Sequence, residues 1–254
     1  SRLDHLLTEI DADDWSRPTA LPGWDVKDNV AHIIGTEAML DGESPKVEID
    51  RTEHPHVRND IGAFNEQWVQ SMRAEAPGNL LNRFRDLTTR RLRALEKMSA
   101  DEWDAESFTP AGPDTYGRFM RIRAFDCWMH EQDIREALGC PGGEGGPAAD
   151  LAIEEMATAM GFVVGKRAGA PAGARVRFEL TGPAARRIDV EVGERARVVD
   201  DLAEPPTVTI AMPAGVFARL GGGRAEPAEH ADAITIDGDT ALGERIVANL
   251  AYTI

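Results

Sequence analysis

The sequence contains little cysteine and few basic residues, and each shortage narrows what the chain can be. It has 2 cysteines, Cys127 and Cys140, too few for a disulfide framework, so a reduced, cytoplasmic protein is expected. The 28 Lys and Arg are outnumbered by 44 Asp and Glu, which gives a formal net charge of −16. Nucleic acids and anionic membranes attract basic surfaces, so neither is an expected partner.

Long apolar runs and the signatures of several common site types are also missing. No apolar run approaches the roughly 20 residues that span a bilayer, and no charged-then-apolar signal segment opens the chain. The sequence has no Gly-x-Ser-x-Gly elbow and no Cys-x-x-Cys motif. The run Gly221-Gly-Gly-Arg224 lacks the Lys-Ser/Thr ending of a phosphate-binding loop. Serine hydrolase, redox and P-loop chemistries are therefore not predicted.

The most informative segment that is present covers residues 115–138, where ionisable groups lie on the apolar face of an expected helix. Gly139 and Pro141 end this segment. At 100° per residue Asp126, His130 and Asp133 share a face with apolar side chains. Asp126 and His130 are an i,i+4 pair, so their side chains can meet. A carboxylate among apolar residues is costly unless a metal, a cation or a buried network compensates its charge.

The remaining pattern predicts an α+β protein with a helical bundle in residues 1–146 and a small α+β domain in residues 147–254. A cluster of glycine and proline at 139–147 marks the boundary. Before it, helices are expected over 26–40, 59–74 and 80–98, with Pro77-Gly78 as a breaker and a long loop around 108–114. After it, a helix is expected over 148–166, alternating strands over 175–180, 188–192, 207–211 and 233–237, and helices over 213–220 and 239–250.

Two side chains on one helix do not hold a metal ion, so a third ligand is needed from elsewhere. His32 is the best candidate, although its helix points the main apolar stripe away from it and places it at the flank of the bundle. Periodicity alone does not bring His32 to Asp126 and His130. Two other interpretations stay open: Asp126 pairs with Arg121 or Arg123 on its own helix, and His130 is a satisfied interior histidine.

Other candidate ligands and nucleophiles carry weaker signals. His54 and His56 flank a proline in an expected loop and are interpreted as surface residues. Cys127 follows Asp126 but points about 100° away from it, so a core position is expected.

Two segments together resemble the actinobacterial mycothiol-dependent maleylpyruvate isomerase family. They are Gly23-Trp-Asp-Val-Lys-Asp-Asn-Val-Ala-His32 and, about ninety residues later, Asp126-Cys-Trp-Met-His130-Glu-Gln-Asp-Ile-Arg-Glu-Ala-Leu-Gly139. The resemblance implies a DinB-like four-helix bundle. The segment Ala233-Ile-Thr-Ile-Asp-Gly-Asp239-Thr-Ala-Leu-Gly243 fits the family's second domain, which resembles a sterol-carrier protein.

The resemblance also implies a metal site and a cosubstrate. It assigns His32, Asp126 and His130 as metal ligands, although the family's acid is often glutamate where this chain has aspartate. Two imidazoles and a carboxylate suit zinc, with nickel or another divalent ion as alternatives. Mycothiol is the implied thiol, and a small electrophile the implied substrate.

The expected activity is that of a thiol transferase or an isomerase. A non-catalytic metal-binding or ligand-binding protein of the same fold remains the alternative. With either function, a monomer or homodimer is expected. Asp133 is expected to support a ligand, with a salt bridge to Arg123 or Arg135 as the competing role. Arg224 is expected to bind a substrate carboxylate.

Overall fold

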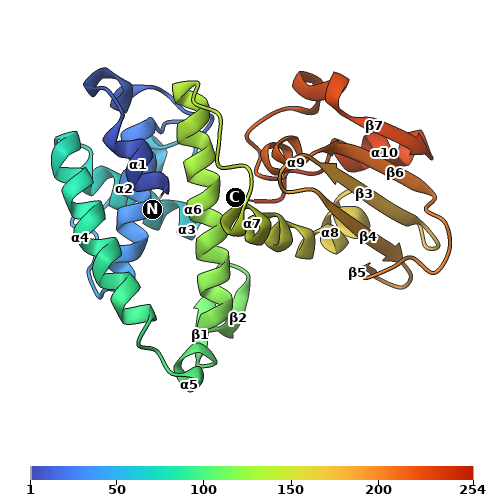
Figure 1. Cartoon of the computed structure of the whole chain (residues 1–254), viewed down its shortest axis with the longest axis horizontal. Helices are drawn as coiled ribbons and strands as arrows, with labels where there is room; N and C mark the ends of the chain where they lie inside the picture. Colours follow the sequence, from blue (N-terminus) through green and yellow to red (C-terminus); the bar gives the residue numbers. More distant parts are fainter. Residues whose placement is uncertain (1, 254) are drawn as a thin grey trace. The chain divides into compact units, whose positions relative to one another are not determined.

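The computed structural model of the chain describes residues 2–253 (Figure 1). It divides into two compact units, Ser1–Gly143 and Glu144–Ile254. The first unit is almost entirely helical and the second is built on a five-stranded sheet. The predicted α+β class is therefore confirmed. Within the described residues no helix combines the length and apolar character that a membrane crossing requires.

The first unit contains six α-helices, two short 3₁₀ turns and a hairpin among its described residues. They are α1 (Arg2–Thr8), η1 (Ala12–Ser16), α2 (Val26–Leu40), η2 (Arg51–Glu53), α3 (Asp60–Met72), α4 (Pro77–Leu95), α5 (Ala100–Trp103), β1 (Glu106–Thr109), β2 (Gly112–Thr115) and α6 (Tyr116–Leu138). The hairpin lies in the segment that the sequence predicted as a loop. Pro77 occupies the first turn of α4 and so begins that helix, whereas the sequence analysis interpreted Pro77-Gly78 only as a breaker.

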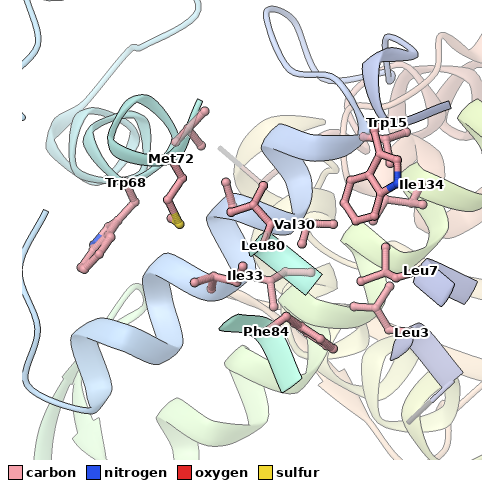
Figure 2. Close-up of a cluster of buried hydrophobic side chains, with 14 of the residues drawn as sticks. Leu3, Leu7, Trp15, Val30, Ile33, Trp68, Met72, Leu80, Phe84 and Ile134 are labelled. Carbon is pink, nitrogen blue, oxygen red and sulfur yellow. The ribbon is translucent and has the colours of Figure 1, made fainter. Parts of the chain in front are cut away.

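The core of this unit surrounds α2, which packs against α3, α4 and α6. Val30 and Ile33 of α2 meet Met72 of α3 and Leu80 of α4 within one buried cluster (Figure 2). Gly35 lets α3 approach closely, since a Cβ at this position would lie 2.5 Å from the Trp68 side chain. Because neighbours cover α2 on several sides, its polar residues Asp28, Asn29 and His32 are buried.

The second unit is a sheet with helices packed on it (Figure 1). Its strand order is β5-β4-β3-β6-β7, and only the β3–β6 pair is parallel. Phe178 of β3 meets Phe217 of α9 with ring centroids 5.9 Å apart. The elements are α7 (Pro147–Thr158), α8 (Met160–Phe162), the π-helical turn η3 (Val163–Arg167), β3 (Arg175–Thr181), β4 (Arg186–Val192), β5 (Ala196–Val199), β6 (Val208–Pro213), α9 (Ala214–Gly221), η4 (Pro227–Ala233), β7 (Thr235–Gly238) and α10 (Thr240–Val247).

Candidate metal centre

Helix α2 carries His32, and local hydrogen bonds fix where this helix begins. Asp25 is the N-cap: its Oδ1 accepts from the Asp28 backbone N–H at 2.8 Å, and Asp28 Oδ2 accepts from the Asp25 N–H at 3.2 Å. The two residues thus form a reciprocal capping box, which satisfies backbone N–H groups in the first turn of the helix. His32 is only 4% exposed. The expectation that it lies at the flank of the bundle was therefore wrong, because α6 covers that face of α2.

Helix α6 carries the other members of the cluster. Thr115 caps its first turn by accepting from the Arg118 N–H at 3.1 Å, and Gly139 ends it in a left-handed conformation with φ 64°. Within these limits Asp126, His130 and Asp133 follow at i, i+4 and i+7 and lie on one face.

His32, Asp126 and His130 converge in the structure. His32 Nε2 lies 3.2 Å from Asp126 Oδ2, and His130 Nε2 lies 3.4 Å from Asp126 Oδ1. The two imidazole centroids are 4.6 Å apart, and one ligand atom from each residue falls within 4.8 Å of the others. Tetrahedral zinc with bonds of about 2.0–2.2 Å spaces its ligand atoms roughly 3.3–3.6 Å apart. The three side chains thus fit a divalent ion.

The far side of the His130 ring supports the same interpretation. His130 Nδ1 lies 2.7 Å from Asn29 Oδ1 and 3.3 Å from Asp133 Oδ2. These acceptors hold a proton on Nδ1, so Nε2, which faces Asp126, is the nitrogen available to an ion. Metal-binding histidines are usually oriented by such a hydrogen bond. Asp133 is 2% exposed and contacts His130, whereas Arg135 pairs with Glu131.

Arg123 also reaches the cluster, as one of the open interpretations expected. Its Nη1 forms an ion pair with Asp126 Oδ2, its Nε pairs with Glu37 at 3.0 Å, and its Nη2 donates to the Ile33 carbonyl at 3.0 Å. The guanidinium therefore compensates the charge of Asp126. It does so through Oδ2, while Oδ1 faces His130.

Burial and charge set opposite protonation preferences for the two histidines. Burial lowers the pKa of His32 to about 4, so this ring is neutral at pH 7. Burial also acts on His130, but the charge of Asp126 and hydrogen bonds to Asp126 and Asp133 outweigh it and raise the pKa of His130. Burial opposes ionisation of Asp126, yet its interactions with His32, Arg123 and His130 hold its pKa well below the ordinary value. A metal ion at this site competes with a proton on His130.

Trp24 forms a wall beside both histidines. Its ring centroid lies 5.3 Å from that of His32 and 6.0 Å from that of His130. Its indole N–H donates to Glu66 Oε2 at 2.8 Å. A cavity of about 360 Å³ borders the same tryptophan, and its other lining residues include Thr19, Asp28 and Arg73. The Asp126 side chain is 32% exposed, so the cluster is not sealed from solvent.

Two family models cover most of the chain. Residues 1–135 match the mycothiol maleylpyruvate isomerase N-terminal domain, and residues 150–245 match the C-terminal domain of the same family. The chain belongs to the mycothiol maleylpyruvate isomerase family. The resemblance that the two sequence segments suggested is thereby confirmed.

Two solved structures share the fold of this chain. A crystal structure of the mycothiol-dependent maleylpyruvate isomerase matches with a TM-score of 0.58 and 17% identity, covering 92% of this chain and 87% of that chain. A point mutant of that isomerase matches with the same score, at 18% identity and the same coverage. At these identities the likeness concerns the fold.

Two uncharacterised proteins of Mycobacterium tuberculosis are 27% identical over 139 residues. The match covers 54% of this chain, and the chain spans about half the length (52%) of these curated relatives.

Several polar residues around the cluster carry weaker signals in the sequence. Asn29 precedes His32 by three positions on the same helix, so its place beside the histidines follows from the helical spacing. Glu66 lies with Ala63 and Val69 on the buried face of α3. A carboxylate on the apolar face of a helix is also the signal that identified Asp126. Arg224 lies in the second unit, after α9, where its guanidinium donates to the Gly222 carbonyl. Its catalytic role stays a prediction.

Proposed function

We propose that this chain is a metal-dependent enzyme that uses mycothiol either to isomerise a small electrophile such as maleylpyruvate or to attach the thiol to such an electrophile. The observation that carries the proposal is the convergence of His32 Nε2, His130 Nε2 and Asp126 within 4.8 Å of one another. Three protein ligands are the set that catalytic zinc sites use, because they leave one coordination position for a reactant. Family membership supports mycothiol as that reactant.

Each surrounding residue has a role in this proposal. Asn29 and Asp133 hold the imidazole of His130 so that Nε2 faces the ion. His32 is available as a neutral ligand at pH 7 because burial disfavours its protonation. Trp24 keeps water from one side of the two rings. Asp133 is thus a positioning residue, since it acts through His130.

A bound divalent ion lowers the pKa of an incoming thiol and so supplies a thiolate at neutral pH. An isomerase returns the thiol unchanged after it has added to a conjugated double bond, allowed rotation and left again. A transferase consumes one thiol for each product. In either reaction, a substrate that carries a carboxylate needs a cationic side chain to bind it. Arg224 is proposed for that role.

The test separates the two reactions by the fate of the thiol. Zinc-loaded protein is incubated with mycothiol and maleylpyruvate, and both the substrate and the free thiol are followed. Loss of maleylpyruvate at constant thiol concentration establishes an isomerase. Equal loss of thiol and of a generic electrophile such as a bimane establishes a transferase. If the rates with zinc-loaded and metal-free protein both equal the uncatalysed rate, the enzymatic proposal is wrong.

One observation favours a second candidate, a non-catalytic protein of the same fold. Arg123 pairs with Asp126, so the carboxylate is compensated by a cation from its own helix. In this alternative the protein binds zinc, or only the thiol, without accelerating either reaction. Zinc binding together with an unaccelerated thiol reaction would support this second candidate.

A further inference from the structure

A second group of potential ligands lies on the other side of Trp24. His54 Nδ1 lies 3.4 Å from Glu66 Oε1, and His56 Nε2 lies 3.0 Å from Glu66 Oε2. The two imidazole centroids are 5.8 Å apart, and one ligand atom from each residue falls within 4.8 Å of the others. The expectation that both histidines are surface residues was wrong, because their side chains are only 17% and 20% exposed.

The carboxylate at the centre of this group is fully removed from water. The exposed fraction of the Glu66 side chain is 0%. Arg73 approaches it only to 4.0 Å and binds Asp28 at 2.8 Å instead. The closer partners of Glu66 are the two imidazoles, the indole of Trp24 and an amide. A buried carboxylate with such partners leaves a demand for positive charge that a divalent ion satisfies.

Contacts around the group hold it in position. The Trp24 indole donates to Glu66 Oε2 at 2.8 Å, and the Gln70 amide donates to Oε1 at 2.7 Å. Metal-binding carboxylates are commonly oriented by such donors. Gly23, with φ +81°, packs directly on the ring of His56: a Cβ there would lie 2.8 Å from Cε1. The ring is thereby fixed between Gly23 and Glu66.

We propose that His54, His56 and Glu66 form a second site for a divalent transition-metal ion of the zinc class. Two imidazoles and one glutamate are a donor set that zinc uses in proteins. Ligand atoms of tetrahedral zinc lie about 3.3–3.6 Å apart. The 3.4 Å separation between His54 and Glu66 falls within this range, and the 3.0 Å separation between His56 and Glu66 is slightly shorter. This site uses none of the residues of the His32–Asp126–His130 cluster. Trp24 touches both groups, by its ring on one side and its N–H on the other.

Metal content of the whole chain tests the second site without any measurement of activity. Protein without a histidine tag is saturated with zinc, dialysed against metal-free buffer and analysed by plasma mass spectrometry. We expect two zinc ions per chain, and one in each of the double variants His54→Ala/His56→Ala and His32→Ala/His130→Ala. The matched control is His5→Ala/His230→Ala, which removes two imidazoles outside both groups and should keep two ions.

The outcomes distinguish the two sites. If His54→Ala/His56→Ala holds as much zinc as the unmodified protein, the second site is overturned. If His32→Ala/His130→Ala keeps all its zinc while His54→Ala/His56→Ala loses one ion, the cluster behind the proposed function is overturned and the second site stands. Should the double alanine variant fail to fold, Glu66→Gln is the near-isosteric replacement. It should also lose one ion per chain, and retention of both ions would overturn the second site.

Discussion

The helical unit contains two buried groups in which one carboxylate meets two histidines, and the groups differ in what compensates the carboxylate. Asp126 pairs with the guanidinium of Arg123, whereas Glu66 is held by neutral donors, with Arg73 4.0 Å away. Asp126 is also 32% exposed, while Glu66 is not exposed at all. The first group is open to a reactant and has an internal cation. In the second group the carboxylate is sealed from water and lacks a cation within hydrogen-bonding distance, whereas its two histidines are 17% and 20% exposed. The same residue types therefore suit reaction in one place and structural metal binding in the other.

The largest predicted effect separates the two groups by function. His32→Ala/His130→Ala should reduce the mycothiol-dependent rate more than the roughly 10- to 100-fold that changes in outer hydrogen bonds cost, because it removes two ligands. His54→Ala/His56→Ala should leave a much larger rate, since it disturbs the reaction only through the position of Trp24. The measurement is kcat/KM for maleylpyruvate with zinc in excess. Equal losses of kcat/KM in both variants would contradict the assignment of the reaction to the His32–Asp126–His130 cluster.

The charge of Arg123 predicts the largest effect on stability. Without zinc, Arg123→Met leaves Asp126 without its buried cation, while Glu37 keeps its ion pair with Arg91. The free energy of unfolding should fall by about 3–5 kcal/mol, as for other buried ion pairs that lose one member. Zinc should restore part of this loss because it compensates Asp126.

Urea unfolding in the presence of a chelator measures the loss of unfolding free energy, and urea unfolding in the presence of zinc measures how much of it the ion restores. Arg73→Met is the comparison: this half-exposed arginine lies 4.0 Å from Glu66 but also binds Asp28 at 2.8 Å, and its loss should cost less than that of Arg123→Met. A loss as large as that of Arg123→Met would show that the contrast between the two carboxylates has no energetic basis.

Changes to the outer hydrogen bonds should act on one group at a time. Asp133→Asn removes a charged acceptor from His130 Nδ1, and Gln70→Ala removes a donor from Glu66 Oε1. Each should weaken zinc binding about 10- to 100-fold, the first only at the His32 site and the second only at the Glu66 site. Chelator competition, carried out in the background of the opposite double alanine variant, gives each affinity separately. A variant that weakens the opposite site would contradict the independence of the two groups.

The smallest predicted effect concerns Asp28, the carboxylate that binds Arg73. Burial, and then the charge of Asp25, raises the pKa of Asp28 to about 6. A raised pKa means that the folded protein binds this proton more tightly than the unfolded chain does. The charged form therefore costs stability above pH 6, and the cost disappears as the pH falls toward 4.

Asp28→Asn should therefore be more stable than the unmodified protein at pH 8, by about 1–2 kcal/mol, with the advantage shrinking at pH 5. Denaturant midpoints of both proteins across this range are the measurement. A difference that grows toward low pH would contradict the sign of the shift.

Local signals made much of the helical unit predictable from the sequence. The Asp25–Asp28 capping box and the left-handed Gly139 fix the ends of α2 and α6, and each depends on residues close in the chain. The spacing within α6 likewise predicted that Asp126 and His130 meet. The position of His32 did not follow from periodicity, because its contact with Asp126 spans 94 residues. It came from the resemblance to a family.

The elements that the sequence analysis missed depend on distant packing. The predicted helix over 148–166 forms as α7, α8 and the π-helical turn η3, with a break at Ala159 that the sequence did not predict. The backbone at Gly161 and Gly165 lies close to β5: a Cβ would lie 3.0 and 2.6 Å from atoms of Ala196. β5 is an edge strand of four residues, too short for an alternation of apolar and polar residues to identify it. The burial of His54 and His56 depends on Glu66, which is contributed by the following helix.

The most direct test of the metal-binding account is an anomalous-scattering map from crystals grown with zinc. The account predicts a peak within roughly 2.0–2.2 Å of His32 Nε2, His130 Nε2 and one carboxylate oxygen of Asp126. No peak at that position, with the Arg123 guanidinium on Asp126 and His32 hydrogen-bonded to the same carboxylate, would contradict it.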